Sequence, residues 1–386
     1  MGSALACRAR QAAPPVEPSA LGAPISHYGL RSRFEKASRF FRPTTIPEEA
    51  SSRSPLHDTY GILTPSSLHF ERHHGGVPDI DPSAHTLTIH GLVERPIVFT
   101  VDEIKRLPSV SRIFFLECSG NSASEWKGAA EADVQRAHGL TSCSEWTGVW
   151  LSTLLRESGV QPRGTWILAE GADACKLARS IPIAKAMHDV LLAYGQNGEA
   201  LRPEQGYPLR LIVPGWEGNV SVKWVRRIKV LDQPAMTRWE TSKYTDLLAD
   251  GTARQFTFDM EAKSVITRPS GGQTLAGAGI YEVTGLAWSG RGAIVRVDIS
   301  VDGGRTWATA TLQEPVLPRA HARFTWSWRW DGRDAVLQSR CTDETGYVQP
   351  SRANLVAARG VNSNYHNNAI QSWSVTADGS VANGNA

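Results

Sequence analysis

The chain has 386 residues, 41% of them hydrophobic, and is therefore long enough to bury the cores of two domains. Its 41 lysine and arginine residues nearly balance its 38 aspartate and glutamate residues, which argues against the strongly basic face that nucleic-acid binding requires. No stretch approaches the roughly 20 apolar residues that a membrane-spanning helix needs. We therefore expect a globular protein without a nucleic-acid-binding face or a membrane span.

The first predicted segment is an extended N-terminal arm over residues 1–55. Its many Arg, Ser, Pro and Glu residues and its weak hydrophobic periodicity are typical of a segment that wraps a partner or the protein's own core. Residues 1–24 are rich in Ala and Pro and show no apolar export signal.

Residues 56–248 are predicted to mix short strands and helices. Thr100 and Glu103 form a capping-box pattern that opens a helix, and Pro108 ends it. Between residues 148 and 159, leucines recur at helical spacing and Gly159 provides a C-terminal stop. Strands are expected over 87–89, 113–116, 166–169 and 209–213, and a further helix over 183–194.

Residues 249–362 change character and predict an immunoglobulin-like β-sandwich. Apolar residues alternate over 294–301 and 324–330, and Asp302-Gly303-Gly304 provides a turn. Tryptophans at every second position of the later strand indicate a packed inner face or an interface; they are Trp326, Trp328 and Trp330. A tail over 363–386 is expected to be frayed from about Ser374. The predicted fold class is α+β.

The chain has five cysteines without a Cys-x-x-Cys pair, so neither a zinc framework nor a disulfide scaffold is indicated; they are Cys7, Cys118, Cys143, Cys175 and Cys341. Cys118 follows the apolar run 113–116 and opens a turn with Gly120, so a predicted strand presents one thiol at a loop. An inert buried thiol is one interpretation, because free cysteine is among the most buried residue types. A thiolate ligand of a metal is the other.

Basic residues distant in sequence favour the metal interpretation. Each one alone is more often a solvated or ion-paired surface group. Together with Cys118 they describe a pocket for an anionic cofactor around one soft ligand; they are Arg72, His74, Arg210 and Lys223.

These motifs resemble the sulfite oxidase family of molybdenum enzymes over residues 65–360. The matching blocks are Phe70-x-Arg72-x-His74, Leu116-Glu117-Cys118-Ser119-Gly120-Asn121, Gly206-Tyr207-Pro208-Leu209-Arg210, Ser221-Val222-Lys223-Trp224 and Val297-Asp298-Ile299-Ser300-Val301-Asp302-Gly303-Gly304. Within the family, the stretches 67–74, 203–207 and 342–350 are most similar to the molybdenum subunit of bacterial sulfane dehydrogenases. The resemblance implies a molybdopterin-binding domain over 56–248 and a sandwich dimerisation domain over 249–362.

The resemblance also implies which residues hold the cofactor. Cys118 would be the single protein ligand of molybdenum, beside a pyranopterin dithiolene, and a soft thiolate suits such a metal. Basic residues would donate charge-assisted hydrogen bonds to the pterin phosphate. Tyr244 would lie beside the metal oxo group. The implied cofactor-binding residues are Phe70, Arg72, His74, Cys118, Asp173, Ser180, Gln205, Arg210, Ser221 and Lys223.

The sequence differs from animal sulfite oxidases beside the implied metal. Ser122 and Ala123 stand where those enzymes have two arginines, and Gln205 stands where they have a histidine. Fewer cations predict a pocket less suited to free sulfite, a small doubly charged anion. Arg291, near the family's substrate arginine, is predicted to supply the remaining charge, so the predicted catalytic residues are Tyr244, Arg72 and Arg291.

The function implied by the resemblance is oxidation of sulfane sulfur, held as a persulfide on a sulfur carrier protein, during thiosulfate oxidation. Free sulfite is the alternative substrate. Without a Cys-x-x-Cys-His haem site, the chain is expected to pass electrons to a c-type cytochrome subunit. A homodimer core and a periplasmic location are implied as well. A binding module with an inert Cys118 is the alternative from another class, and molybdenum analysis distinguishes the two.

Overall fold

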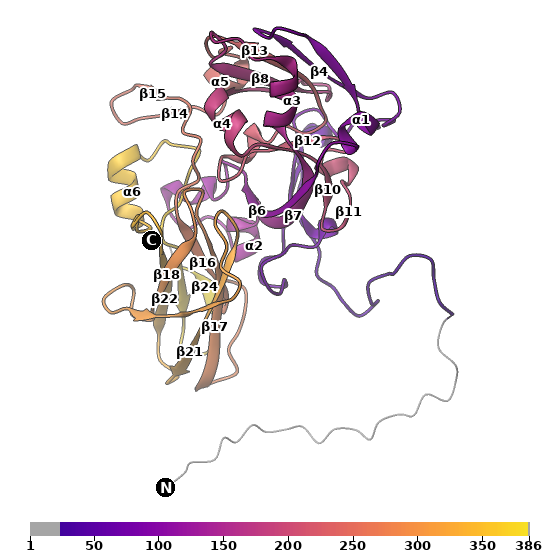
Figure 1. Ribbon diagram of the computed structural model, residues 1–386. Helices are drawn as coiled ribbons and strands as arrows, with labels where there is room; N and C mark the ends of the chain where they lie inside the picture. Colours follow the sequence, from indigo (N-terminus) through magenta and orange to yellow (C-terminus); the bar gives the residue numbers. More distant parts are fainter. Residues whose placement is uncertain (1–23, 385–386) are drawn as a thin grey trace. The chain divides into compact units, whose positions relative to one another are not determined.

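The computed structural model describes residues 24–384, and one compact unit that begins at Ala37 contains all the helices and strands described below (Figure 1). Residues 24–36 belong to a separate unit and contain turns and bends without helix or strand. Cys7 and the first part of the predicted arm lie outside the described residues. Over residues 24–384, none of the helices combines the length and apolar character that crossing a bilayer requires.

The later part of the predicted arm forms regular structure. A short 3₁₀ turn, η1 (Pro47–Glu49), precedes an antiparallel sheet in the order β1-β2-β3; its strands are β1 (Phe40–Arg42), β2 (Ser51–Arg53) and β3 (Glu71–Arg72). Ser51 lies opposite Arg72 in this sheet. The arm is therefore joined directly to the segment that carries three predicted cofactor contacts.

Two five-stranded sheets build the mixed part of the unit. The first has the order β11-β10-β7-β6 with β12 paired to β10; its strands are β6 (Val110–Glu117), β7 (Thr141–Trp150), β10 (Leu191–Gln196), β11 (Glu199–Ala200) and β12 (Arg210–Ile212). The second has the order β5-β4-β13-β8-β9; its strands are β4 (Thr86–Gly91), β5 (Ile97–Thr100), β8 (Trp166–Gly171), β9 (Ala178–Pro182) and β13 (Val225–Leu231). The four strands predicted in this part are confirmed.

Helices lie between and beside these sheets. α1 (Val101–Lys105) begins at the predicted capping box, in which the Thr100 hydroxyl accepts from the Glu103 amide at 3.2 Å. α3 (Leu151–Ser158) ends at Gly159, whose φ of 68° is left-handed. The others are α2 (Val134–His138), α4 (Ile183–His188), α5 (Arg238–Thr241) and α6 (Arg352–Arg359), with the 3₁₀ turns η2 (Ser66–Leu68), η3 (Ala123–Lys127), η4 (Pro203–Gln205) and η5 (Gly218–Val220).

The helix expected over 183–194 is wrong in its second half. α4 ends at His188, and the chain re-enters the first sheet as β10. Leu191 and Leu192 are fully buried there between β7 and β12. A short apolar run fits a helix face and a buried strand equally well, and pairing on both sides decides for the strand.

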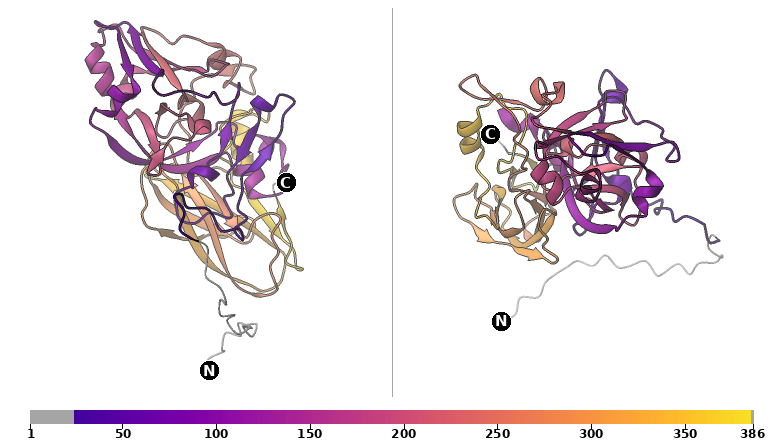
Figure 2. Two further views of the ribbon diagram at one scale, coloured as in Figure 1. Left: turned by 90° about the vertical axis from the view of Figure 1, so that its right-hand side faces the viewer. Right: turned by 45° about the horizontal axis from the view of Figure 1, so that its top comes forward.

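The sandwich consists of two antiparallel sheets that follow the small pair β14 (Asp246–Leu247) and β15 (Ala253–Arg254). One sheet has the order β16-β17-β21-β20; its strands are β16 (Lys263–Arg268), β17 (Gly279–Trp288), β20 (Thr311–Gln313) and β21 (Ala322–Trp330). The other has the order β19-β18-β22-β23-β24; its strands are β18 (Ile294–Ser300), β19 (Ala308–Thr309), β22 (Ala335–Asp343), β23 (Ser372–Val375) and β24 (Val381–Asn383). The orange and yellow strands of this part are seen from two further sides in Figure 2.

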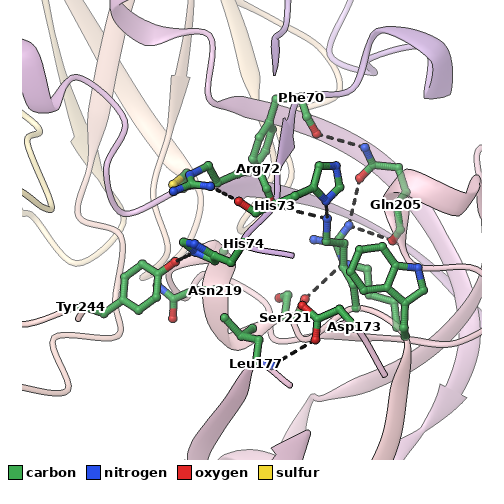
Figure 3. Close-up of a pocket in the computed structure, with 15 residues that line it drawn as sticks. Phe70, Arg72, His73, His74, Asp173, Leu177, Gln205, Asn219, Ser221 and Tyr244 are labelled. Atoms are coloured by element: carbon green, nitrogen blue, oxygen red, sulfur yellow. Dashed lines mark hydrogen bonds between the residues drawn. The ribbon is translucent and has the colours of Figure 1, made fainter. Parts of the chain in front are cut away.

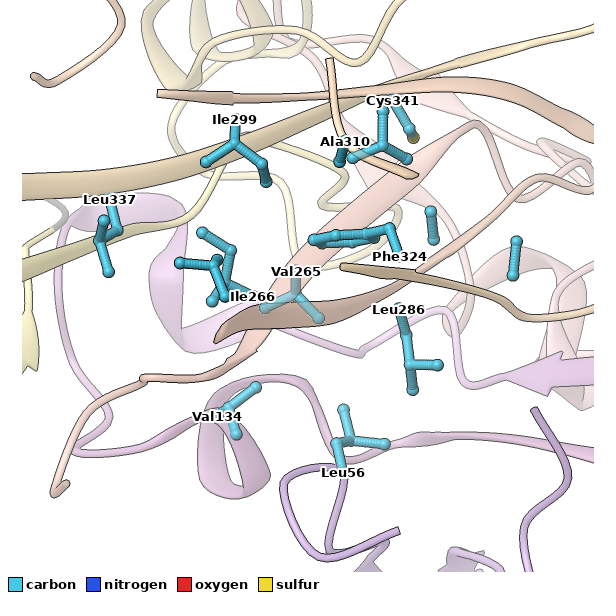
Figure 4. Packing of buried hydrophobic residues seen from close by; sticks show 14 of the residues in the cluster. Leu56, Val134, Val265, Ile266, Leu286, Ile299, Ala310, Phe324, Leu337 and Cys341 are labelled. Carbon is cyan, nitrogen blue, oxygen red and sulfur yellow. The ribbon is translucent and has the colours of Figure 1, made fainter. Parts of the chain in front are cut away.

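A single apolar core joins the sandwich to the mixed part. Val265, Phe324 and Leu337 pack between the two sandwich sheets, and Leu56 and Val134 from earlier in the chain join the same cluster (Figure 4). Trp328 and Trp330 belong to it as well, and both are almost fully buried. The inner-face interpretation of these two tryptophans is therefore confirmed.

The expectation of a tail frayed from Ser374 is wrong over the described residues. β23 pairs with β22, and β24 pairs with β23, so the tail completes the second sandwich sheet. Trp373 and Val375 are buried in the core. The side-chain amide of Asn383 donates to the backbone carbonyl of Glu131 at 2.9 Å. This segment contains many small residues, so the alternation of apolar side chains that predicts a strand is hard to recognise in its sequence.

Candidate functional site

Cys118 stands at the end of β6, where the chain leaves the sheet. Its amide donates to the Leu140 carbonyl at 2.9 Å, and its carbonyl accepts from the Asn121 amide at 2.8 Å, which closes the predicted turn. Burial raises the pKa of the Cys118 thiol, so a cation beside the sulfur is needed to hold it as a thiolate.

The turn after Cys118 is also held by residues from the far end of the chain. The Ser119 carbonyl accepts from the amide of His366 at 2.8 Å. The Ser122 carbonyl accepts from the Asn367 side chain at 3.0 Å. The thiol is therefore presented by a turn that the segment after α6 fixes from outside.

Two pockets meet at Cys118. The first, here called the Lys223 pocket, spans about 650 Å³ including open solvent and is lined by Phe70, Arg72, His73, His74, Cys118, Asp173, Leu177, Gln205, Arg210, Gly218, Asn219, Ser221, Lys223, Trp224 and Tyr244 (Figure 3). The second, here called the Arg53 pocket, spans about 1370 Å³ including open solvent and is lined by Glu49, Ser51, Arg53, Arg72, His74, Cys118, Gly120, Leu140, Cys175, Arg238, Trp239, Lys243, Tyr244 and Tyr365. Four residues line both, so the thiol lies where a group in one pocket can meet a molecule in the other.

Arg210 is a buried cation of the Lys223 pocket. Its guanidinium donates to the Gln205 side-chain oxygen at 3.0 Å and to the Ser221 carbonyl at 3.3 Å, and both acceptors are uncharged. Burial lowers the pKa of Arg210 to about 9. An anion placed in the pocket would therefore stabilise a charge that the protein itself leaves uncompensated.

Lys223 lies beside Arg210 through a β-bridge. Its ammonium contacts the His73 ring nitrogen at 2.8 Å and donates to the Glu204 carbonyl at 3.1 Å. Burial, and then the charge of Arg210, hold the pKa of Lys223 well below its ordinary 10.5. Gly206 makes this approach possible, because a Cβ there would lie 3.1 Å from the Cβ atoms of both Arg210 and Lys223.

His74 and Tyr244 form the wall that the two pockets share. The His74 Nε2 atom lies 2.6 Å from the Tyr244 hydroxyl (Figure 3). The His74 ring also packs on Trp239. Burial, with the charge of Arg72, lowers the pKa of His74 to about 3, and burial raises the pKa of Tyr244. Both groups are neutral at physiological pH, so the phenol is available as a hydrogen-bond donor or acceptor beside Cys118.

The predicted site residues divide into those that line the pockets and those that do not. Nine of the ten predicted cofactor-binding residues line the Lys223 pocket. Ser180 does not; it is buried, and its hydroxyl and amide both donate to the carboxylate of Glu240. Asp173 lines the pocket, although its carboxylate also accepts from the Cys175 thiol and the Leu177 amide.

The predicted role of Arg291 does not agree with its position. Arg291 lies outside both pockets, pairs with Glu261 at 2.9 Å and packs over the Tyr347 ring. It lies in the loop between β17 and β18, where its guanidinium is paired with the Glu261 carboxylate.

The expected loss of positive charge relative to the animal enzymes stays a prediction. Ser122 is buried away from the pockets, and its hydroxyl lies 2.8 Å from His138 and 3.0 Å from the ammonium of Lys263. The Arg53 pocket instead draws four cations from other segments against one carboxylate, that of Glu49; the cations are Arg53, Arg72, Arg238 and Lys243.

Several pocket residues were missed by reasoning from the sequence. His73 adjoins His74 directly after β3 and lies inside the matched motif over residues 70–74. Asn219 and Trp224 lie in or beside matched motifs. Arg53 belongs to a segment interpreted as an extended arm, and its sequence neighbourhood carries no signal of the pocket.

The comparisons with known proteins agree with this arrangement. Residues 74–239 match the oxidoreductase molybdopterin binding domain, and residues 254–373 match the Mo-co oxidoreductase dimerisation domain. The chain is 31% identical to the sulfite oxidase of Gallus gallus over 379 residues, covering 91% of this chain and 79% of that protein. It is 31% identical to the mitochondrial sulfite oxidase of Rattus norvegicus and 32% identical to the nitrate reductase of Hordeum vulgare, and it spans 61% and 37% of their lengths.

A solved structure is similar as well. The crystal structure of the sulfane dehydrogenase SoxCD from Paracoccus pantotrophus superposes with a TM-score of 0.93, at 48% sequence identity, over 95% of each chain. Fold and site together define a molybdopterin-binding oxidoreductase with a dimerisation domain. The chain belongs to the sulfite oxidase family.

The family's molybdenum-molybdopterin cofactor fits the residues present. Arg210 and Lys223 are cations that contact uncharged acceptors, as a binding site for a phosphate would provide. Cys118 offers a soft ligand at the end of the same pocket. Arg72, His74 and Asp173 provide further donors and acceptors in the same pocket.

Proposed function

We propose that the protein oxidises the sulfane sulfur of a persulfide carried on a partner protein and passes the electrons to a c-type cytochrome subunit. The observation that carries this proposal is the 48% identity over 95% of the chain to the sulfane dehydrogenase SoxCD. The balanced step is R–S–S⁻ + H₂O → R–S–S–O⁻ + 2H⁺ + 2e⁻. One sulfur–oxygen bond forms, and two electrons leave.

The chain's own residues have separable tasks in this proposal. Arg210 and Lys223 bind the phosphate of the cofactor, and Cys118 ligates the metal through its Sγ atom. When bound, the cofactor supplies a metal centre that transfers oxygen derived from water and accepts two electrons. Tyr244, positioned by His74 at 2.6 Å, presents a neutral hydroxyl toward both pockets and orients the sulfur through a hydrogen bond.

Assembly and location belong to the same proposal. The match of residues 254–373 to a dimerisation domain supports a homodimer core. The proposed acceptor is a c-type cytochrome and the proposed substrate is carried by a second protein, so we place the enzyme in the periplasm. Light scattering of the loaded protein, alone and with the cytochrome subunit, tests the dimer.

Free sulfite is the second candidate substrate, and one observation favours it. The Arg53 pocket offers four cations to a small anion, which matches the charge of sulfite. The sulfite oxidases of Gallus gallus and Rattus norvegicus are also relatives of this chain.

Steady-state oxidation of both substrates distinguishes the candidates. The loaded enzyme, with molybdenum content measured first, is supplied with the cytochrome subunit and either sulfite or a persulfide on the carrier protein. We expect a kcat/KM at least tenfold higher for the carried persulfide. A higher value for sulfite would replace the proposal by a sulfite dehydrogenase, and turnover of neither substrate by fully loaded enzyme would overturn both.

A further inference from the structure

Arg53 is a buried arginine, and two of its guanidinium nitrogens have no hydrogen-bond partner among the described residues. It ends β2, and only 6% of its surface is exposed. Within residues 24–384, its Nε and Nη1 atoms are buried and make no hydrogen bond. Leaving buried donors of a charged group unsatisfied is costly, so such a group usually has a ligand to satisfy it.

The backbone around Arg53 is fixed. Its carbonyl accepts from the Gln135 side chain at 2.9 Å, and the next residue, Ser54, donates from its amide to the Gly139 carbonyl at 2.8 Å. A Cβ at Gly139 would lie 2.8 Å from the Cβ of Arg53, so the absence of a side chain there makes room for the arginine stem. These contacts fix the backbone and the side-chain stem of Arg53, so the fold sets the position from which its guanidinium extends.

Strand geometry directs Arg53 into the pocket that reaches Cys118. Ser51 and Arg53 are two residues apart on β2 and therefore share one face of the sheet. Ser51 lies opposite Arg72 on β3, and all three residues line the Arg53 pocket with Cys118. Burial, and then the charge of Arg42, lower the pKa of Arg53, while the charges of Glu131, Cys118 and Asp133 act in the opposite direction.

Two other cations of this pocket already contact groups of the protein. Arg72 donates to the Glu49 carbonyl at 2.9 Å, and Arg238 packs over the Trp239 ring. Among the described lining residues of the pocket, Arg53 is the one with buried, unpartnered side-chain nitrogens.

We propose that Arg53 is a specificity-determining residue that binds the oxyanion of the sulfur substrate or product opposite Cys118. The inference rests on the proposed oxidation of an anionic sulfur compound. A planar guanidinium matches two oxygens of a sulfur oxyanion, whereas the single charged sulfur of a persulfide is a weak acceptor. Arg53 therefore favours sulfur that already carries oxygen: sulfite, and the oxidised products of a persulfide.

The test uses sulfate, a sulfur oxyanion that cannot be oxidised further. Sulfate binding to the loaded enzyme is measured by the shift of its thermal unfolding temperature with sulfate concentration, and KM is measured for sulfite. We expect Arg53→Met to weaken sulfate binding at least tenfold and to raise the KM for sulfite by a similar factor. The KM for carried persulfide should change less than threefold.

Two further variants control for structural effects. Arg42→Met removes an arginine of the same small sheet that pairs with Glu131 at 2.8 Å, and it should bind sulfate as the parent does. Arg53→Lys keeps the charge without the planar donor pair, so its sulfate affinity should lie between those of the parent and Arg53→Met. If Arg53→Met does not accumulate as folded protein, Arg53→Lys provides the test. A sulfate affinity of Arg53→Lys equal to that of the parent would overturn the proposal.

The outcomes separate this inference from the proposed function. Parental sulfate affinity and parental KM for sulfite in loaded Arg53→Met overturn the role of Arg53, even if the parent oxidises both substrates. Conversely, Arg53-dependent sulfate binding in a parent that oxidises neither substrate supports the anion site and overturns the proposed oxidation.

Discussion

The ammonium of Lys263 lies 3.1 Å from the carboxylate of Glu117, the residue before Cys118, and both side chains are at most 2% exposed. Glu117 also accepts from the Trp288 indole at 2.6 Å and from the Asn121 side chain at 2.9 Å. Lys263 begins the first strand of the sandwich, whereas Glu117 ends a strand of the mixed part. A buried ion pair therefore connects the part of the chain that matches the dimerisation domain to the turn that carries Cys118.

Replacing Lys263 with Met should destabilise the protein by about 3–5 kcal/mol, because it leaves the Glu117 carboxylate buried and uncompensated. Chemical denaturation of loaded enzyme measures the loss. Arg268→Met is the matched control on the same strand, since Arg268 pairs with Asp58 at the surface and its loss should cost about 0.2–1 kcal/mol. The double variant Glu117→Gln with Lys263→Met should recover part of the loss, and equal losses in Lys263→Met and Arg268→Met would contradict the role of the pair.

Replacing Cys118 with Ser should abolish turnover while the fold is retained, because a serine oxygen is a harder ligand than a thiolate. The free energy of unfolding should change by about 1 kcal/mol at most, since a serine hydroxyl can accept the hydrogen bond that the Gly120 backbone donates to the Cys118 sulfur. Activity, molybdenum content and denaturation are measured together. Cys341→Ser, in the sandwich core beside Gln349, is the control that should keep turnover; full activity of folded Cys118→Ser would refute the ligand assignment.

Lys223 should make cofactor retention depend on pH. The pKa of Lys223 in the apoprotein is well below 10.5, and a bound phosphate raises it because it stabilises the charged ammonium. Between these two pKa values, binding takes up one proton, so affinity should fall about tenfold per pH unit as pH rises. The apoprotein itself should become more stable with pH in the window below 10.5, since the unfolded lysine keeps the proton that the folded one has lost.

Cofactor release measured from neutral to alkaline pH checks this dependence. Lys223→Met should weaken binding by about 1.5–3 kcal/mol and remove the slope assigned to the lysine. An unchanged slope in that variant would assign the pH dependence to another group, and unchanged pterin content would show that Lys223 does not contact the phosphate.

Arg291→Met should leave the kinetics of either substrate within about twofold of the parent, because Arg291 pairs with Glu261 outside both pockets. Steady-state measurement beside Arg53→Met gives the comparison. A tenfold rise in KM for Arg291→Met would restore the catalytic role that its place in the sequence suggests.

Much of the fold could be predicted because local signals agree with the tertiary structure. The capping box at Thr100 and the glycine stop at Gly159 are satisfied within one helix each, so their sequence is sufficient. The strand at Leu191 and the pair β23–β24 depend on neighbours distant in sequence, and the local pattern alone misassigned both. Pairing partners of this kind are not visible in a single segment.

The site shows the same division. The thiol turn and the motifs of Arg210 and Lys223 are contiguous, and the structure brings them to one pocket. The positive charge of the Arg53 pocket depends in part on Arg53. This residue comes from a segment without a motif, and the three-stranded sheet β1-β2-β3 places it in the same pocket as Cys118. Ser122 shows the opposite case: its place in the sequence suggests a pocket residue. Its backbone has a φ of 64°, and its buried hydroxyl contacts His138 instead.

The hydrogen bonds from His366 and Asn367 to the turn after Cys118 set an order for the protein's maturation. Those residues leave the ribosome more than 200 residues after the cysteine they help to position, so the emerging mixed part alone cannot complete the turn. Contacts so far apart in sequence form late, because closing long loops is slow. We therefore expect insertion of the cofactor to follow synthesis of the chain through Asn367, so that a product truncated before this residue would not compete with finished protein for molybdopterin.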